Sequence, residues 1–391
     1  MSDTPHSHHT ATRLAHTGRD PKSHDGFVNI PAYRGSTIIH PDVATLESGN
    51  MPVTYGRRGS PLVQGLEASI AELEGGARTI LLPSGLSAVT SALMAFVETG
   101  DHILVSDSVY KPNRVFCDSM LSRLGVETEY YDPLIGGDIA SLIRDNTRLI
   151  FTESPGSQSF EVQDIPAISA AAKARGILVL IDNTWASPLY FKPFDHGVDV
   201  SIQAATKYIV GHSDAMLGAI TTTATHADRL ASDLYKMGHS AGTEEVYLGQ
   251  RGMRTIDVRL QRHWENGLEV ATWLERRDEV DRVLHPALPS HPQHDLWKRD
   301  FLGASGLFSI VLKNVPKPAV SAMLDSLTLF GMGYSWGGFE SLIVPFNPTS
   351  YRSATQWPHT GPALRLHIGL EHPEDLITDL ERGFDRLHAA A

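Results

Sequence analysis

The chain has 391 residues, 41% apolar and 20% charged, which is enough for two or three packed units with a substantial core. Its formal net charge of −12 argues against a general surface for nucleic acid or anionic membrane. No apolar run approaches the roughly 18 residues that span a bilayer. The polar start, "MSDTPHSHHTATRLAHTGRD", and a single cysteine predict a cytoplasmic protein.

The cysteine and the N-terminal histidines do not indicate a site. Cys117 lies in the helical pattern "NRVFCDSMLSRLG", where a small apolar side chain is favoured over a catalytic thiol. His6, His8 and His9 gather near the N-terminus, but no HExxH or paired CxxC motif accompanies them. The sequence therefore predicts no metal centre.

Residues 1–60 are rich in Gly and Pro and look irregular. A regular alternation follows them. The segment "SPLVQGLEASIAELEGG" predicts a helix that ends at paired glycines, and "ARTILLPSGLSAVTSALMAFVETG" predicts a strand, a tight turn and a helix. Four more short runs rich in Leu, Ile and Val have helical patterns between most of them: "DHILVSDSVY", "TRLIFTESP", "GILVLIDNTW" and "VDVSIQAATK".

Runs that are apolar on both sides are typical of strands covered on both faces, and their alternation with helices predicts an α/β fold with a parallel sheet. Ligands of such sheets bind at the carboxyl ends of the strands. We expect a set of polar residues to meet there: Ser106, Asp107, Glu153, Asp182, Thr206 and Lys207.

The pattern changes after about residue 250. A long helical stretch, "RGMRTIDVRLQRHWENGLEVATWLERR", precedes three strand-like runs, "GLFSIVL", "SLIVPF" and "ALRLHIGL". We therefore predict an N-terminal arm over residues 1–60, a large domain over 61–250 and a smaller α+β domain over 251–391.

Lys207 and Asp182 stand at the ends of neighbouring apolar runs. A lysine at a strand end, near a carboxylate and hydroxyls, is able to form a Schiff base with a carbonyl compound. A buried aspartate needs a partner, and the pyridinium nitrogen of pyridoxal phosphate (PLP) is one that would make the ring an electron sink. A solvated lysine and a helix-capping or ion-paired aspartate are the alternatives.

Two further segments suit a phosphate group. The turn "PSGLSAV" places backbone amides at a helix N-terminus, which is an anion site, and "TYGRRGSP" adds two arginines to a flexible loop. An ordinary helix start and a surface turn are the alternatives for these segments.

Taken together, these motifs over roughly residues 10–388 resemble the cystathionine β-lyase branch of the PLP-dependent enzymes of Cys/Met metabolism. The segments that carry the resemblance include "YGRRG", "PSGLSAV", "SDSVYKPNRVFC", "ESPGS", "IDNTWA", "SIQAATKYIVGHSDAM", "YSWGGFES" and "LRLHIGLE". The resemblance implies the PLP-dependent transferase fold of type I, as in aspartate aminotransferase, with a mainly parallel sheet in the large domain.

The resemblance also implies roles for particular residues. Lys207 would be the Schiff-base lysine and Asp182 the partner of the pyridinium nitrogen. Tyr110 would stack on the ring and assist proton transfer. The remaining implied contacts are Gly85, Leu86 and Thr206 at the phosphate, Arg365 and Ser335 at the substrate carboxylate, and Tyr55 and Arg57 reaching the phosphate from a neighbouring subunit, with Tyr55 and Trp336 also lining the substrate site.

Shared sites of this kind imply at least a dimer, and the family usually forms tetramers. Two positions depart from the family pattern. Ala204 stands where many relatives carry a serine, which removes one phosphate hydroxyl. Leu86 stands where relatives often have Met or Ala, which makes the lining near the ring bulkier.

The expected reaction is α,β-elimination of L-cystathionine to homocysteine, pyruvate and ammonia, a step of methionine biosynthesis. Trp336 favours this β-lyase activity, since most γ-acting relatives carry leucine there. A cystathionine or methionine γ-lyase, a broader cysteine-S-conjugate β-lyase and a PLP-bearing regulatory binding protein remain alternatives.

Overall fold

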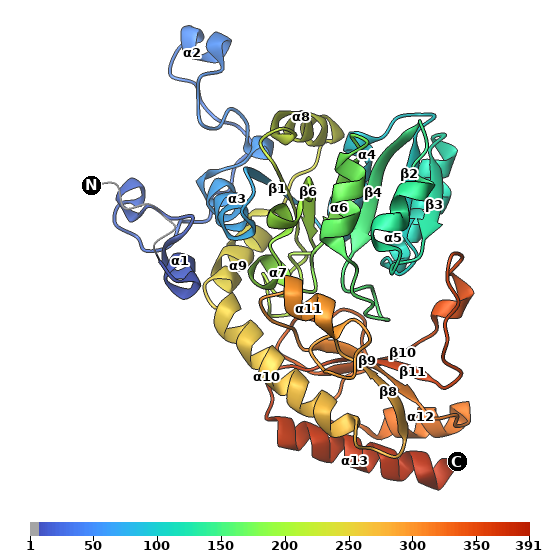
Figure 1. The fold of residues 1–391 in the computed structure, drawn as a ribbon. Coiled ribbons are helices and arrows are strands. Elements are labelled where there is room, and N and C mark those ends of the chain that lie inside the picture. The colour runs from blue at the N-terminus through green and yellow to red at the C-terminus, as the bar shows by residue number, and fades with distance from the viewer. Residues whose placement is uncertain (1–7) are drawn as a thin grey trace.

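The computed structural model describes residues 8–391 and contains two sheets (Figure 1). The larger sheet has seven strands in the order β1-β7-β6-β5-β4-β2-β3. The pairs from β6 through β3 are parallel, and β7 pairs antiparallel with both β6 and β1, so β7 alone runs against the others. The strands are β1 Arg78–Leu82, β2 His102–Ser106, β3 Glu127–Tyr131, β4 Thr147–Glu153, β5 Leu178–Asp182, β6 Val200–Gln203 and β7 Gly218–Thr222.

The smaller sheet follows in sequence and is antiparallel, in the order β10-β11-β9-β8. Figure 1 shows it below the large sheet, surrounded by α10 (Ile256–Leu274), α12 (Lys317–Ser326) and α13 (Pro373–Ala390). Its strands are β8 Val280–Leu284, β9 Leu307–Leu312, β10 Leu342–Phe346 and β11 Ala363–His367. The predicted division into domains remains a proposal, and its boundary at 250/251 falls inside α9.

Helices cover both faces of the large sheet because its strands are apolar on both sides. Ile103 and Val105 of β2 pack in a cluster with residues of α4, α5 and α8, whereas Leu104 packs in the opposite cluster with α6. The helices are α1 Thr10–His16, α2 Val43–Ser48, α3 Pro61–Glu74, α4 Gly85–Phe96, α5 Lys111–Phe116, α6 Ile165–Lys173, α7 Ser187–Tyr190, α8 Ala227–Met237, α9 Thr243–Met253, α10 Ile256–Leu274, α11 His294–Asp300, α12 Lys317–Ser326 and α13 Pro373–Ala390.

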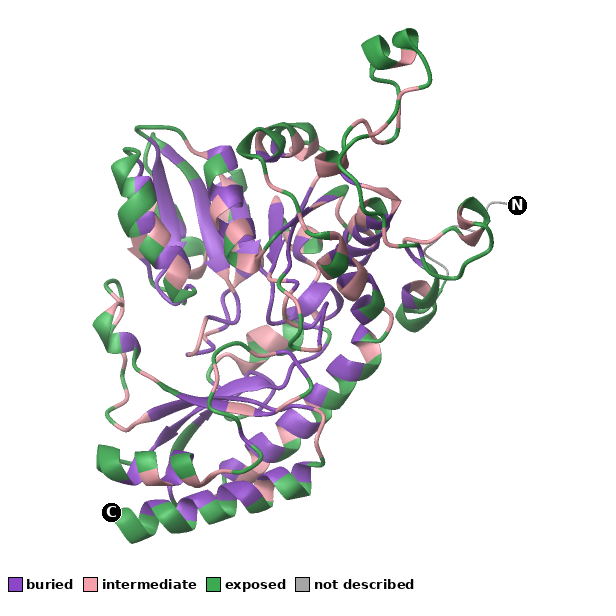
Figure 2. Ribbon diagram, turned by 180° about the vertical axis from the view of Figure 1, so that it is seen from behind, coloured by how far each residue is buried: buried purple, intermediate pink, exposed green. Residues whose placement is uncertain are grey.

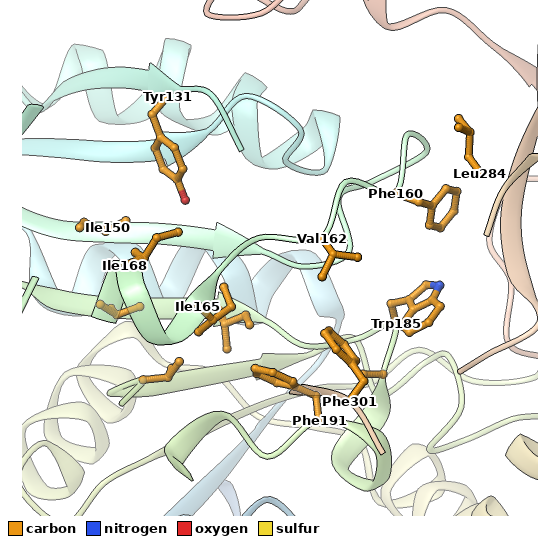
Figure 3. Packing of buried hydrophobic residues seen from close by; sticks show 14 of the residues in the cluster. Tyr131, Ile150, Phe160, Val162, Ile165, Ile168, Trp185, Phe191, Leu284 and Phe301 are labelled. Atoms are coloured by element: carbon orange, nitrogen blue, oxygen red, sulfur yellow. The ribbon is translucent and has the colours of Figure 1, made fainter. Parts of the chain in front are cut away.

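Aromatic side chains join the two sheets into one core. Figure 3 shows Trp185, Phe191 and Phe301 packed together below the strands, with Phe160 close to Leu284 of β8. The Trp185 indole donates a hydrogen bond of 2.9 Å to the backbone oxygen of Leu307 in β9. This contact fixes the turn after β5 against the small sheet.

Residues 8–60 form an arm with only short helices, as their Gly and Pro content predicts. Figure 1 shows α2 standing well away from the rest of the chain, and Figure 2 colours most of this arm as exposed. Its exposed apolar side chains include Phe27, Ile39 and Val43. Among the described residues, none of the helices has the length and apolar character that a membrane crossing requires.

The structure confirms the predicted α/β class, with a mainly parallel large sheet and a smaller sheet that follows it in the sequence.

Three strands were not predicted, because their sequences have no clear apolar pattern. The edge strand β3 ("ETEYY") is polar, β7 ("GAITT") consists of small and hydroxyl residues, and β8 ("VDRVL") is short and charged. The long helical stretch after residue 250 is also broken at Arg254 and Thr255 into α9 and α10.

Candidate active site

Three parallel strands bring acidic and basic groups together at their carboxyl ends in the large sheet. Glu153 ends β4 and Asp182 ends β5, and the two residues are partners in the register of the sheet. The β6 strand lies beside β5, and Lys207 follows it by four residues. The predicted convergence at the carboxyl ends of the strands is therefore present for these residues.

Asp182 is buried, and only one of its carboxylate oxygens is satisfied by the chain. Its Oδ1 accepts hydrogen bonds from the Thr184 amide (3.0 Å) and hydroxyl (2.5 Å). No residue within 8–391 donates a hydrogen bond to Oδ2. Burial raises the pKa of Asp182, while the Thr184 bonds and the charge of Lys207 oppose that rise. A cationic N–H group at Oδ2 would stabilise the ionised carboxylate.

The Lys207 amine lies among residues from both sheets. Its Nζ donates a hydrogen bond of 2.5 Å to Ser335 Oγ and lies 5.2 Å from the centroid of the Trp336 ring. Burial and the charge of Arg365 lower the pKa of Lys207 to about 8, against the opposing effect of Asp182. The amine therefore gives up its proton more readily than an ordinary lysine, as a nucleophile or base requires.

Tyr110 and Arg365 come from the regions of different sheets, and the charge of Arg365 acts on both Tyr110 and the Lys207 amine. Tyr110 lies between β2 and α5, and its backbone N–H donates a 2.7 Å hydrogen bond to Glu153 Oε2. Burial raises the pKa of Tyr110, with Glu153 and Asp182 adding to the rise and Arg365 opposing it. Arg365 lies on β11, is buried, and donates through Nη2 to the Ser335 carbonyl at 3.1 Å. Burial lowers its pKa to about 10.

The predicted phosphate turn packs against the end of β6. Ser84 caps α4, its hydroxyl accepting the Ser87 amide at 3.1 Å, so the amides of Gly85 and Leu86 remain without intrahelical partners. A Cβ atom on Gly85 would lie 2.4 Å from the Ala204 Cβ, so the turn accepts only glycine at this close approach. The twelve-residue helix thus presents its N-terminus beside the segment that carries Lys207.

Thr206 has a different environment from the one expected. Its hydroxyl accepts the Leu217 amide at 2.9 Å and donates to the Leu217 carbonyl at 3.1 Å. These bonds tie the Lys207 turn to the start of β7. A phosphate contact of this hydroxyl stays a prediction.

Tyr55 and Arg57 lie apart from the other candidate residues within the same chain. Arg57 donates through Nη1 to the Tyr235 carbonyl at 2.9 Å, and its guanidinium lies 4.2 Å from the centroid of the Tyr235 ring. Both residues line a hollow between the arm and α8. In residues 8–391, no hydrogen bond or ion pair joins either of them to Lys207 or Asp182.

Glu153 is a site neighbour to which the sequence analysis assigned no role. Burial and the charge of Asp182 raise its pKa well above the usual range, against the Tyr110 amide bond. The two carboxyls raise each other's tendency to hold a proton, and only Asp182 has the charge of Lys207 acting against that effect. The sequence showed Glu153 at a strand end, but its pairing with Asp182 depends on a register that one sequence does not display.

Comparisons with known proteins agree with this geometry. Residues 11–385 match the family described as Cys/Met metabolism PLP-dependent enzyme. A protein of Rhizobium johnstonii is 52% identical over 377 residues, covering 95% of each chain. The cystathionine beta-lyase MetC of Escherichia coli is 45% identical over 387 residues, covering 96% of this chain and 98% of that one. The crystal structure of metB from Corynebacterium glutamicum has a TM-score of 0.91 at 28% identity, covering 98% of this chain and all of the other.

Proposed function

The chain belongs to the family of Cys/Met metabolism PLP-dependent enzymes, and from this premise we propose that it acts as a cystathionine β-lyase. The family membership confirms the predicted cofactor, PLP, and the predicted class of carbon–sulfur lyase. The observation that carries the proposal is the placement of Lys207 and Asp182 beside Ser335, Trp336 and Arg365, in a chain similar over almost its whole length to cystathionine β-lyases.

The residues present fit PLP at its ring nitrogen, its phosphate and its aldehyde. Asp182 Oδ2 is available for the ring nitrogen, and the Gly85 and Leu86 amides at the N-terminus of α4 suit the phosphate. Lys207, with its lowered pKa, suits a covalent bond to the aldehyde. When bound, the cofactor supplies an electron sink for the pair of electrons left at the substrate Cα.

The remaining steps of the proposed reaction would be carried out by side chains of this protein. Arg365 would bind the substrate carboxylate, because its buried guanidinium already holds the Ser335 carbonyl and points to the same region as Lys207. The released Lys207 amine would remove the Cα proton. The departing sulfur would then take a proton from Lys207 Nζ or from the Tyr110 hydroxyl.

Trp336 would determine which substrates bind and which of their protons are removed. Its ring is half-buried between the Lys207 amine and the Tyr208 ring, 5.5 Å from the latter. A large rigid side chain next to the amine limits the space around Cβ and Cγ of a bound amino acid. This restriction favours β-elimination over γ-chemistry.

The active unit would be a dimer or a tetramer built from dimers, in the cytoplasm. Tyr55 and Arg57 point away from their own Lys207, which supports their proposed role at the site of a neighbouring subunit. The exposed apolar side chains Phe27, Ile39 and Val43 of the arm would then be covered by that subunit. The single cysteine supports a reducing compartment.

The test is to incubate the purified protein, with PLP, on L-cystathionine and to identify the keto acid. Pyruvate with free homocysteine is the expected result. 2-Oxobutanoate with cysteine would move the assignment to a γ-lyase and make Trp336 a packing residue only. No keto acid from protein that has bound its cofactor would exclude cystathionine as the substrate.

A further inference from the structure

The loop over residues 334–341 presses against Lys207 and has an unusual backbone. Ser335 and Gly337 have φ angles of 80° and 88°, in the left-handed region that a serine rarely adopts. A Cβ on Gly337 would lie 2.9 Å from Lys207 Cα, so the two backbones are in direct contact. The strain at Ser335 persists only if neighbouring groups hold the loop in place.

His367, the last residue of β11, contacts this loop on the side away from the solvent. The Gly337 amide donates a 3.1 Å hydrogen bond to His367 Nε2, and the side chain of His367 is fully buried. Gly337 directly follows Trp336. The imidazole therefore fixes the backbone at the point where the loop turns Trp336 and Ser335 toward the Lys207 amine.

The Gly337 bond requires a neutral imidazole with its proton on Nδ1, because a nitrogen that carries a proton has no lone pair to accept an N–H. Burial holds the pKa of His367 well below its usual range, and the neighbouring His263, Arg365 and Lys207 lower it further, against the carbonyl of Gly338. The His263 ring centroid is 5.1 Å from that of His367. The surroundings thus keep the ring neutral. With its proton on Nδ1 the ring accepts the Gly337 amide, and with its proton on Nε2 it would donate to the Gly338 carbonyl, 3.2 Å away, so Nε2 holds the backbone of this loop in either form.

We propose that His367 is a positioning residue for the reaction, which holds the Ser335–Trp336 loop against Lys207 through the hydrogen bonding of Nε2 to the backbone of Gly337 and Gly338. The inference deepens the proposed function, on which its kinetic test rests. His367 does not touch the reacting atoms. It acts through Ser335, whose hydroxyl accepts the Lys207 hydrogen bond.

The test compares His367→Leu with His367→Gln in the holoenzyme. Leucine removes the acceptor and leaves the buried Gly337 amide unsatisfied, so kcat/KM for L-cystathionine falls about 10- to 100-fold. Glutamine offers a side-chain oxygen in place of Nε2 and restores kcat/KM to within about threefold of the wild type. In the Ser335→Ala background, the factor by which His367→Leu lowers kcat/KM is at least about threefold smaller than in the wild type, since both changes act through one contact.

His285→Leu is the matched control. His285 is also buried in the small-sheet region, and its Nδ1 accepts the Ala287 amide at 3.1 Å, but it has no hydrogen bond to the 334–341 loop in the described residues. The control lowers the melting temperature while kcat/KM stays within about twofold of the wild type. A loss of kcat/KM in His285→Leu equal to that in His367→Leu would reduce His367 to a general packing role and overturn the proposal.

A spectroscopic arm separates this inference from the proposed function. The absorption of the cofactor bound at Lys207, titrated with pH in the absence of substrate, has a shifted midpoint in His367→Leu but not in His367→Gln or His285→Leu. An unshifted midpoint in His367→Leu, or additive effects with Ser335→Ala, would refute the positioning role. Failure of the wild type to cleave L-cystathionine would refute the proposed substrate and leave the spectroscopic result to decide on His367.

Discussion

Two lysines of the chain share a lowered pKa of about 8 but differ in what surrounds the amine. Lys192 Nζ donates to the Pro188 carbonyl at 2.5 Å and to that of Leu73, so backbone oxygens surround it. Lys207 Nζ instead lies beside a hydroxyl, an indole ring and the charges of Asp182 and Arg365. A shifted pKa alone therefore does not identify the reactive amine, and the neighbours do.

Lys207→Ala should reduce turnover of L-cystathionine by at least about a thousandfold, because it removes both the cofactor bond and the base. The fold should remain, since the hydrogen bond of the Lys207 side chain goes to Ser335 of the candidate site. Product formation and melting temperature are measured for Lys207→Ala and, as the control, for Lys192→Met. Near-normal turnover in Lys207→Ala would remove Lys207 from the mechanism.

Trp336→Leu should lower kcat/KM for β-elimination about tenfold or more and raise the share of 2-oxobutanoate among the keto acids. The wider space beside Lys207 admits conformations in which Cγ chemistry competes. Chromatography of both keto acids measures the ratio. Trp297→Leu is the control, because Trp297 packs in the same core cluster with its indole bonded to Gly303, and its ratio should match the wild type. Equal ratios in both variants would contradict the specificity role.

At the scale of elements, the segment that follows β10 bridges the two sheets. Figure 1 shows this segment, in red, rising from the small sheet toward α5. The amides of Ser353 and Thr355 donate to the buried Asp107 carboxylate at 3.0 and 2.8 Å, and Arg114 pairs with it. Burial alone would raise the pKa of Asp107, but these donors bring it below its usual value. Asp107 precedes Tyr110 by three residues, so the bridge ends at the candidate site.

Asp107→Asn should loosen this bridge, because the side-chain amide nitrogen of asparagine is itself a donor and would face the backbone N–H donors of the segment. Trypsin cleavage after Arg352, whose guanidinium now pairs with Glu161 at 2.8 Å, should become about 10- to 100-fold faster in the holoenzyme. Mass analysis of the fragments over time gives the rate. The exposed Asp145→Asn should be cut like the wild type. Unchanged cleavage in Asp107→Asn would show that the carboxylate does not hold the bridge.

Elements with a strong apolar pattern could be predicted from the sequence, and contacts between distant segments could not. The runs ending at Asp182 and Glu153 were readable because both faces are buried. The polar edge strand β3 gave no such pattern. The bond from Gly337 to His367 and the bridge to Asp107 depend on packing between segments far apart in sequence. The residue types involved, a histidine and an aspartate, are common in ordinary cores and caps.

At the scale of the whole molecule, the separation of Arg57 from Lys207 within one chain leads to a prediction about assembly. Arg57→Ala and Lys207→Ala should each be inactive alone. Co-expressed in equal amounts, they should recover roughly a quarter of wild-type activity, because half of the dimers are mixed and each mixed dimer has one intact site. Activity of the unfractionated mixture measures this recovery, and the doubly tagged mixed dimers purified from it should show about half of wild-type activity. No recovery in the mixed dimers would mean that Arg57 serves the site of its own chain.

The most direct test of the account is to find which lysine carries the cofactor. The holoenzyme is reduced with borohydride, which makes the bond between lysine and cofactor permanent, and is then digested and mapped by mass spectrometry. The label is expected on the peptide that contains Lys207 and on no other. A label on Lys192, the other lysine with a pKa of about 8, or the absence of any label from protein that binds PLP, would contradict it.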